Sequence, residues 1–285
     1  MRRALVLGGG GITGLAWEIG LVAGLAESGV RLGAASDVIG TSAGSVVGTW
    51  IASGGDLAHA AASQREDPPV QDSPGDAPDA GRIMRAFGRW SAIGCYSLDD
   101  GREVGAIARE IESGRQQPWV DAIGQQLGTR SWPAALRVSA VDTRSGAVSI
   151  MDAGSGVALS RAVAASCAVP GIFPTVDIDS RNYMDGAIPT GTHAHRALER
   201  SAQSVLIVAA FDERTPGIGG LMRRELDTEA ARLHEAGTHV ALITPSLRAG
   251  QIVKNAMDPS LRCAAVEAGL EQGRAEASAL EDWQS

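Results

Sequence analysis

Cysteine is scarce in this chain of 285 residues, and the few cysteines form no recognisable pattern. Cys95, Cys167 and Cys263 lie far apart in the sequence and include no C-x-x-C motif. Their number and spacing exclude a disulfide framework and a thiolate zinc site, and they indicate a reducing compartment. Cys167 lies in "AASCAVPG", where a buried core thiol is the commoner interpretation and a reactive thiol is the alternative.

Aromatic residues and positive charge are also in short supply. Phe, Trp and Tyr make up 4% of the chain, and the formal net charge is −8. So few aromatic side chains provide no stacking platform for single-stranded nucleic acid. An acidic surface argues against nucleic acid as the main partner and against simple electrostatic adsorption to anionic lipid. We therefore expect no nucleic-acid partner.

The chain has no long hydrophobic run. No apolar stretch reaches the roughly 18 residues that a membrane-spanning helix needs. The first residues, "MRRALVLGGGG", lack the long apolar core of a signal peptide. These absences predict a cytoplasmic protein. No histidine or acidic cluster indicates a metal site, so the sequence predicts neither a metal nor a cofactor.

Apolar residues, by contrast, make up 44% of the chain, which is enough for a large core. Strand-like runs alternate with helix-like segments over the first 55 residues, as "RALVLGG", residues 13–28, "ASDVIG" and "SAGSVVGTWIASGG". This alternation is typical of a parallel sheet with right-handed crossovers. Two later runs, "SVLIVAAF" and "HVALITP", predict further interior strands. The expected fold class is α/β.

The remaining segments predict hairpins, helices and one long loop. "ALRVSAVDTRSGAVSIMD" and "FPTVDIDSRNYMDGAIP" predict hairpins, and residues 82–128 and "GVALSRAVAASCAV" predict helices. Residues 65–81 are rich in Pro, Asp and Gly and predict an exposed, mobile loop. An amphipathic helix is expected at 258–282, within a C-terminal helical extension at 246–285. Because no repeat or domain boundary is evident, we expect a single domain over residues 1–285.

A serine between two glycines follows the second predicted strand. Residues 40–44, "GTSAG", match the pattern G-x-S-x-G, which is too short to be decisive alone. A serine nucleophile lies on a sharp strand-to-helix turn, where small neighbours avoid clashes and the helix N-terminus favours developing negative charge. Ser42 fits that description, and an ordinary helix N-cap serine is the alternative.

Four consecutive glycines, at positions 8–11, follow the first predicted strand. The run "GGGITG" satisfies the dinucleotide fingerprint G-x-G-x-x-G, but Asp37 opens the second strand and no acid closes it, as ribose binding would require. Consecutive glycines can instead form a nest of N–H groups that holds an oxyanion, or simply permit tight helix packing. Loops at the carboxyl ends of parallel strands share one edge, so the glycines and Ser42 would face one pocket.

A serine nucleophile also needs a base. His234 and His239 come late enough for a Ser–acid–His order, but their place on or just after a predicted helix is more typical of solvated histidines. A carboxylate acting directly on the hydroxyl is the alternative. Asp185 in "NYMDGAIP" and Asp142 in "AVDTRSG" are candidates, for which a D-G turn and an Asx-turn are the ordinary interpretations.

Four segments, in this order, resemble the patatin-like phospholipase family over roughly residues 1–245: "RALVLGGGGITGLAWEIGLVAGL", "GTSAGS", "SRAVAASCAVPGIFPTVDID" and "YMDGA". The resemblance implies a three-layer α/β/α fold with a mainly parallel central sheet and a Ser–Asp dyad without histidine. It also implies hydrolysis of lipid acyl esters through an acyl-enzyme. The expected partners are therefore a lipid or acyl-ester substrate and, transiently, a membrane surface.

Carried over by position, the resemblance implies a role for each motif residue. Ser42 would be the nucleophile, Asp185 the base, Gly9, Gly10 and Gly11 the oxyanion hole, and Gly40, Thr41, Ala43 and Gly44 the turn around the nucleophile. The chain departs from the family at Thr13, where Arg or Lys is common, and in "IPTGTHAH", which lacks an asparagine pair. Both departures leave the dyad intact and bear on substrate preference. A non-catalytic lipid-binding protein of this fold and a dinucleotide-binding oxidoreductase are the alternatives.

Overall fold

The structure is a computed structural model that describes residues 1–66, 79–111, 113–129, 131–211 and 218–284. Within these residues, eight strands form one sheet in the order β5-β6-β3-β2-β1-β7-β8, with β4 paired to β3. The strands are β1 Arg3–Leu7, β2 Asp37–Gly40, β3 Leu136–Asp142, β4 Val148–Met151, β5 Val176–Ile178, β6 Arg181–Asp185, β7 Ser204–Val208 and β8 His239–Ile243. The neighbours β3, β2, β1, β7 and β8 are all parallel, which confirms the predicted fold class. Both predicted hairpins, β3–β4 and β5–β6, are present.

Helices connect the strands. They are α1 Gly11–Glu27, α2 Ala43–Ala52, α3 Leu57–Ser63, α4 Ala80–Ser91, α5 Leu98–Ala108, α6 Gln116–Leu127, α7 Leu159–Ser166, α8 Ile218–Glu235, α9 Leu247–Val253 and α10 Arg262–Glu276. Most of the loop predicted at 65–81 lies outside the described residues. The single helix predicted at 258–282 is wrong in extent, because α10 covers only part of that range. Short 3-10 turns flank α10, and the last one buries Trp283 against the core.

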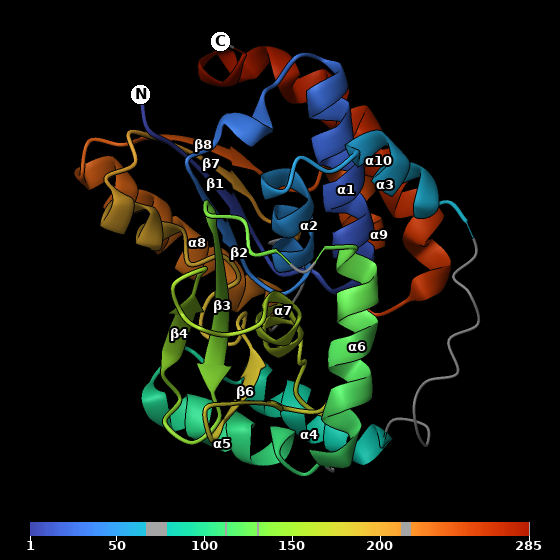
Figure 1. The fold of residues 1–285 in the computed structure, drawn as a ribbon, viewed down its shortest axis with the longest axis vertical. Helices are drawn as coiled ribbons and strands as arrows, with labels where there is room; N and C mark the ends of the chain where they lie inside the picture. Colours follow the sequence, from blue (N-terminus) through green and yellow to red (C-terminus); the bar gives the residue numbers. More distant parts are fainter. Residues whose placement is uncertain (67–78, 112, 130, 212–217, 285) are drawn as a thin grey trace.

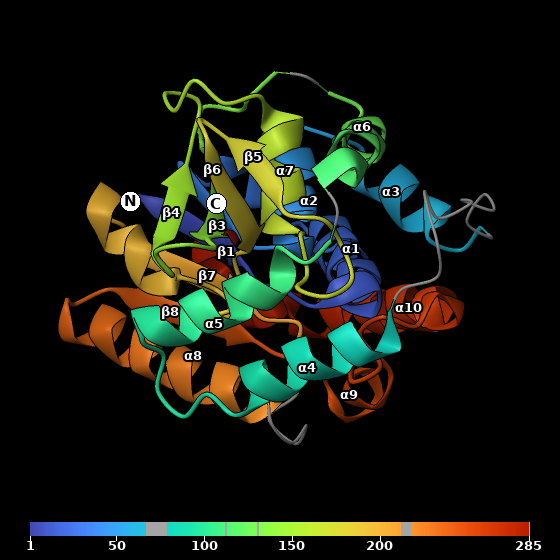
Figure 2. The same ribbon diagram turned by 90° about the horizontal axis from the view of Figure 1, so that it is seen from below.

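The helices cover both faces of the sheet, so the three-layer prediction is confirmed (Figures 1 and 2). Along β1, Leu5 and Leu7 join an apolar cluster with α1, α2, α6, α7 and α10. Ala4 and Val6 point the other way, into a second cluster with α4, α5 and α8. Burial on both faces explains why the strand is continuously apolar in the sequence.

Strand β3 brings the carboxyl ends of β2 and β6 together. Val138 and Ala140 both pair with β4 on one side. On their other side, Val138 pairs with Gly40 at the end of β2, and Ala140 pairs with Asp185 at the end of β6. Because β6 runs antiparallel to β3, its last residue approaches the last residue of β2. This arrangement places the residues that follow β2 beside the end of β6.

Helix α10 packs closely along α1 through glycines. A β-carbon at Gly20 would collide with the backbone oxygen of Val266, and one at Gly269 would collide with that of Trp17. The buried Trp17 indole also donates a hydrogen bond to Gln272 Oε1 at 3.1 Å. The C-terminal segment therefore supports the helix that begins at the glycine loop.

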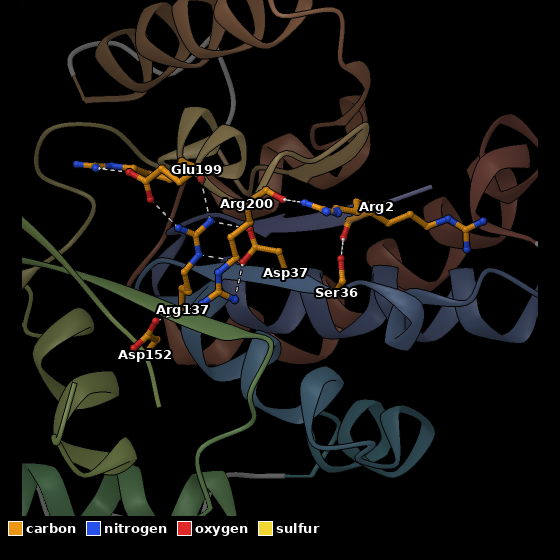
Figure 3. Close-up of polar contacts among 9 residues, drawn as sticks. Arg2, Ser36, Asp37, Arg137, Asp152, Glu199 and Arg200 are labelled. Carbon is orange, nitrogen blue, oxygen red and sulfur yellow. Dashed lines mark hydrogen bonds and ion pairs between the residues drawn. The ribbon is translucent and has the colours of Figure 1, made fainter. Parts of the chain in front are cut away.

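A buried ion-pair network lies at the other end of β2 (Figure 3). The Arg137 guanidinium, on a side chain that is 4% exposed, donates to both carboxylate oxygens of Asp37 at 2.9 and 2.5 Å. It also donates to Glu199 Oε2 at 2.8 Å, and Arg200 lies 3.4 Å from Asp37. Asp37 is thus a structural ion-pair partner at the start of β2. The glycine loop follows the end of the neighbouring strand β1, which is the opposite edge of the sheet.

Candidate catalytic site

Ser42 lies on the sharp turn between β2 and α2, with a left-handed φ of 51°. The glycines on either side are required by close packing. A β-carbon at Gly44 would collide with the backbone oxygen of Leu7, and one at Gly40 would lie 2.5 Å from the Ser45 Cα. A strained serine between two such glycines has the geometry of a nucleophile elbow.

The backbone of Ser42 is held from two sides. Its N–H donates to Ser166 Oγ at 2.8 Å, and the neighbouring Thr41 hydroxyl lies 2.8 Å from Ser139 Oγ. Helix α2 begins at Ala43, so its positive N-terminal end lies directly behind the serine. No sequence pattern distinguishes Ser166, which is one serine within a predicted helix.

Ser42 and Asp185 lie in direct contact at the joined ends of β2 and β6. Ser42 Oγ donates to Asp185 Oδ2 at 2.7 Å, and the two residues are 5% and 1% exposed. The Ala187 N–H donates to the other carboxylate oxygen at 2.8 Å. Burial raises the pKa of Asp185 to about 7, although the hydrogen bonds from Ala187 and Ser42 partly oppose it. A carboxyl group with this pKa can take up and release a proton near neutral pH.

The other candidate bases lie elsewhere. Asp142 Oδ1 accepts the N–H groups of Arg144 and Ser145 at 2.8 and 3.0 Å, which is the Asx-turn interpretation of its sequence. His234 lies in the last turn of α8 and His239 begins β8, and neither lines the pocket that contains Ser42.

The glycine loop lies against the serine. A β-carbon at Gly9 would lie 3.4 Å from the Ser42 Cβ. The Gly9 N–H donates to the Gly191 carbonyl at 2.9 Å and is therefore already used. In the described part of the chain, the N–H groups of Gly10 and Gly11 donate to no protein acceptor. Since α1 begins at Gly11, its dipole adds to these two donors.

Two side chains, those of His193 and Glu229, hold residues 186–195 in place by hydrogen bonds. The sequence predicted a functional role for neither of them. His193 Nε2 lies 2.8 Å from the Gly186 carbonyl, to which it donates its proton. Burial lowers the pKa of His193, which favours this neutral form. Glu229 on α8 is 3% exposed and accepts the Thr192 hydroxyl hydrogen bond at 2.5 Å. Because Gly191 in the same segment accepts the hydrogen bond from Gly9, the segment links Asp185 to the glycine loop.

Ser42 and Asp185 line a pocket of ≈ 660 Å³. Helix α4 contributes much of its wall and crosses the end of the sheet at which β3 finishes (Figure 1). The side chains that make the pocket apolar include Ile83, Phe87, Trp90, Val169, Phe211 and Met222. A cavity of this size and lining is typical of a small-ligand site with a few convergent polar groups.

Cys167 lies close to Ser42 and Asp185, but its thiol is not reactive. Its Sγ is 3.7 Å from Ser45 Oγ, and burial raises its pKa to about 12. The thiol therefore stays protonated at neutral pH, as expected for the core-thiol interpretation.

The arrangement of the described residues also bears on metal binding and on membrane crossing. Among the described residues, no group of three or more His, Cys, Asp or Glu side chains is arranged to hold a metal ion. None of the helices in the described parts of the chain has the length and apolar content to cross a membrane.

Comparison with known proteins supplies a family. The family model described as patatin-like phospholipase matches residues 5–194. Comparison with curated proteins gave no match.

Similar solved structures include VipD from Legionella pneumophila, with 12% identity and a TM-score of 0.46, covering 98% of this chain and 67% of that chain. The type III effector protein ExoU is 16% identical, with a TM-score of 0.43, covering 98% of this chain and 53% of that chain. ExoU in complex with SpcU, from Pseudomonas aeruginosa, is 17% identical, with a TM-score of 0.40 and coverages of 95% and 52%. The chain thus spans about two thirds of the length of the first structure and about half of the others.

Proposed function

Since the chain belongs to the patatin-like phospholipase family, we propose that it hydrolyses acyl esters of lipids with Ser42 as nucleophile and Asp185 as base. The observation that carries this proposal is the 2.7 Å hydrogen bond from Ser42 Oγ to Asp185 Oδ2. The bond lies in a pocket with apolar walls, where an acyl chain can be buried. The mechanism uses no metal or cofactor.

In the acylation step, Asp185 takes the Ser42 proton as Oγ attacks the ester carbonyl carbon. The carbonyl oxygen becomes an oxyanion, which the N–H groups of Gly10 and Gly11 stabilise together with the N-terminus of α1. Asp185 then returns the proton to the alcohol oxygen as the ester C–O bond breaks. Each such donor is typically worth about a hundredfold or more in rate.

In the deacylation step, Asp185 removes a proton from water, which attacks the acyl-enzyme and releases the fatty acid. The apolar pocket holds the acyl chain, and each buried methylene contributes about 0.8 kcal/mol of binding. Met84 lines the pocket and is nevertheless 74% exposed. In this proposal, transient contact with a lipid surface delivers the substrate to the pocket, and Met84 lies at its exposed edge.

The experiment that tests the proposal combines hydrolysis with covalent labelling. The wild-type protein should hydrolyse p-nitrophenyl esters and members of a lysophospholipid panel, and a fluorophosphonate probe should label Ser42. Cys167→Ala is the control, because its labelling should match the wild type if the serine is the reacting group. Folded protein that neither hydrolyses esters nor labels would favour the non-catalytic lipid-binding alternative. Affinity for NAD(P) without esterase activity would favour the oxidoreductase.

The pH dependence should report the buried base. Because Asp185 acts only when ionised and burial raises its pKa to about 7, kcat/KM for a neutral ester should fall as the pH drops below that value. The fall should approach tenfold per pH unit, with a plateau above neutrality. Initial rates with p-nitrophenyl butyrate between pH 5 and 9, corrected for p-nitrophenol ionisation, measure this profile. A plateau that extends down to pH 5 would contradict a base of raised pKa.

A further inference from the structure

One positively charged side chain stands on the wall of the pocket that contains Ser42. Lys254, just after α9, is the single lysine of the chain and lines this pocket. Among the described lining residues, its only charged companion is Asp185. An exposed lysine at the edge of an otherwise apolar pocket is a recognition element for the anionic part of a ligand whose apolar part enters the pocket.

The backbone around Lys254 is fixed to the glycine loop by Thr13. The Thr13 hydroxyl lies 3.3 Å from the Val253 carbonyl and 3.4 Å from the Asn255 carbonyl, on either side of the lysine. The Thr13 N–H donates to the Ala256 carbonyl at 3.1 Å. Thr13 is fully buried under this segment, so a long charged side chain there would displace it. These contacts fix the position of the backbone from which the Lys254 side chain extends.

The charge of Lys254 is available to a ligand. Its Nζ donates to the neutral Gln251 side-chain oxygen at 2.6 Å, and the described residues give it no carboxylate partner. The side chain is exposed. Lysine acts as a flexible point charge and is a common partner of phosphate groups. Of the described residues that line the pocket, Lys254 is thus the one cation, and it shares the pocket with Ser42.

We propose that Lys254 binds the phosphate of an acyl ester whose alcohol portion is phosphorylated, so that the substrate class is an anionic lysophospholipid. This inference rests on the proposed ester hydrolysis. The apolar walls accommodate the acyl chain, which leaves the polar alcohol side of the ester to meet the lysine. The phosphate bears the charge that Lys254 complements, and the scissile ester stays at Ser42.

The test compares two esters that differ only in the phosphate, 1-oleoyl lysophosphatidic acid and 1-oleoylglycerol. Both are presented at the same mole fraction in neutral detergent micelles. Lys254→Gln should raise KM for the phosphorylated ester about tenfold, since hydrogen bonds to charged groups are among the strong ones. The kinetics of 1-oleoylglycerol should stay within about twofold of the wild type. Lys254→Arg should retain most of the preference.

Arg248→Gln is the matched control, because it removes a cation from the adjoining helix α9 at a residue that pairs with Glu271 and does not line the pocket. It should behave like the wild type. The inference is overturned if Lys254→Gln leaves the ratio of kcat/KM for the two esters unchanged, or if the wild type prefers the neutral ester. A wild type that hydrolyses neither ester would instead overturn the proposed function itself, so the two failures are distinguishable.

Discussion

Ser42→Ala should abolish ester hydrolysis, with kcat falling by about 10⁴-fold or more. The variant lacks the oxygen that attacks the ester, while the pocket and the Gly10 and Gly11 amides remain to bind substrate. KM should therefore change little compared with kcat. Initial rates with a p-nitrophenyl ester, divided by the concentration of folded protein, measure the loss.

Asp185→Asn should lower kcat by about 10³- to 10⁴-fold, because the base is lost while the shape of the site is kept. The asparagine oxygen can still accept the Ala187 N–H, which lies 2.8 Å from the carboxylate in the wild type. The double variant Ser42→Ala/Asp185→Asn should lose no more than Ser42→Ala alone, since the two groups act in one step.

Asp142→Asn provides the control for these variants. Asp142 is a carboxylate near the end of the neighbouring strand β3, and its side chain serves a turn. Its replacement should leave kcat at the wild-type value. The dyad assignment fails if either Ser42→Ala or Asp185→Asn hydrolyses esters at the wild-type rate.

Arg137→Leu should reduce the free energy of unfolding by about 3 kcal/mol or more. The substitution leaves the Asp37 carboxylate buried, with a side chain 3% exposed, without the two hydrogen bonds from the guanidinium. Arg200, at 3.4 Å from Asp37, compensates part of the charge, which keeps the loss near the lower end of the usual range. The shift in the urea unfolding midpoint measures it.

A double-mutant cycle isolates the ion pair from the packing around it. Arg137→Leu/Asp37→Leu removes both charges and should be closer to the wild type than Arg137→Leu alone, because no unpaired buried charge remains. Each folded variant should retain the wild-type kcat, since the network lies at the start of β2 and Ser42 follows its end. A loss below about 1 kcal/mol in Arg137→Leu would contradict the prediction that the substitution leaves a buried, unpaired carboxylate.

Local patterns predicted much of the fold because they reflect local physics. The continuous apolar run of β1 follows from burial on both faces of the sheet. Helix α1 is apolar over much of its length because every residue from Ala16 to Leu25 is buried. The turn at Ser42 is visible because only glycine fits at positions 40 and 44. The C-terminal helix was less predictable, because its end depends on how Trp283 packs against the core.

The roles of individual polar groups were harder to predict. Nothing in the sequence distinguishes the Gly9 amide, which bonds to Gly191, from the amides of Gly10 and Gly11, which have no acceptor among the residues that the structure describes. Glu229 lies 44 residues after Asp185 along the chain and reaches the following segment only because α8 packs beside it. Such partners are set by the packing of elements, which no local pattern encodes.

The sequence by itself determined the order of strands and helices, the glycine-flanked serine and the family, because apolar periodicity and glycine requirements are local. Only the tertiary structure decided that β3 brings Ser42 to within 2.7 Å of Asp185, and that Thr13 fixes Lys254 beside the same pocket. The physical reason is that these contacts join residues 143 and 240 positions apart or more, whose distance depends on strand pairing and helix packing across the whole sheet.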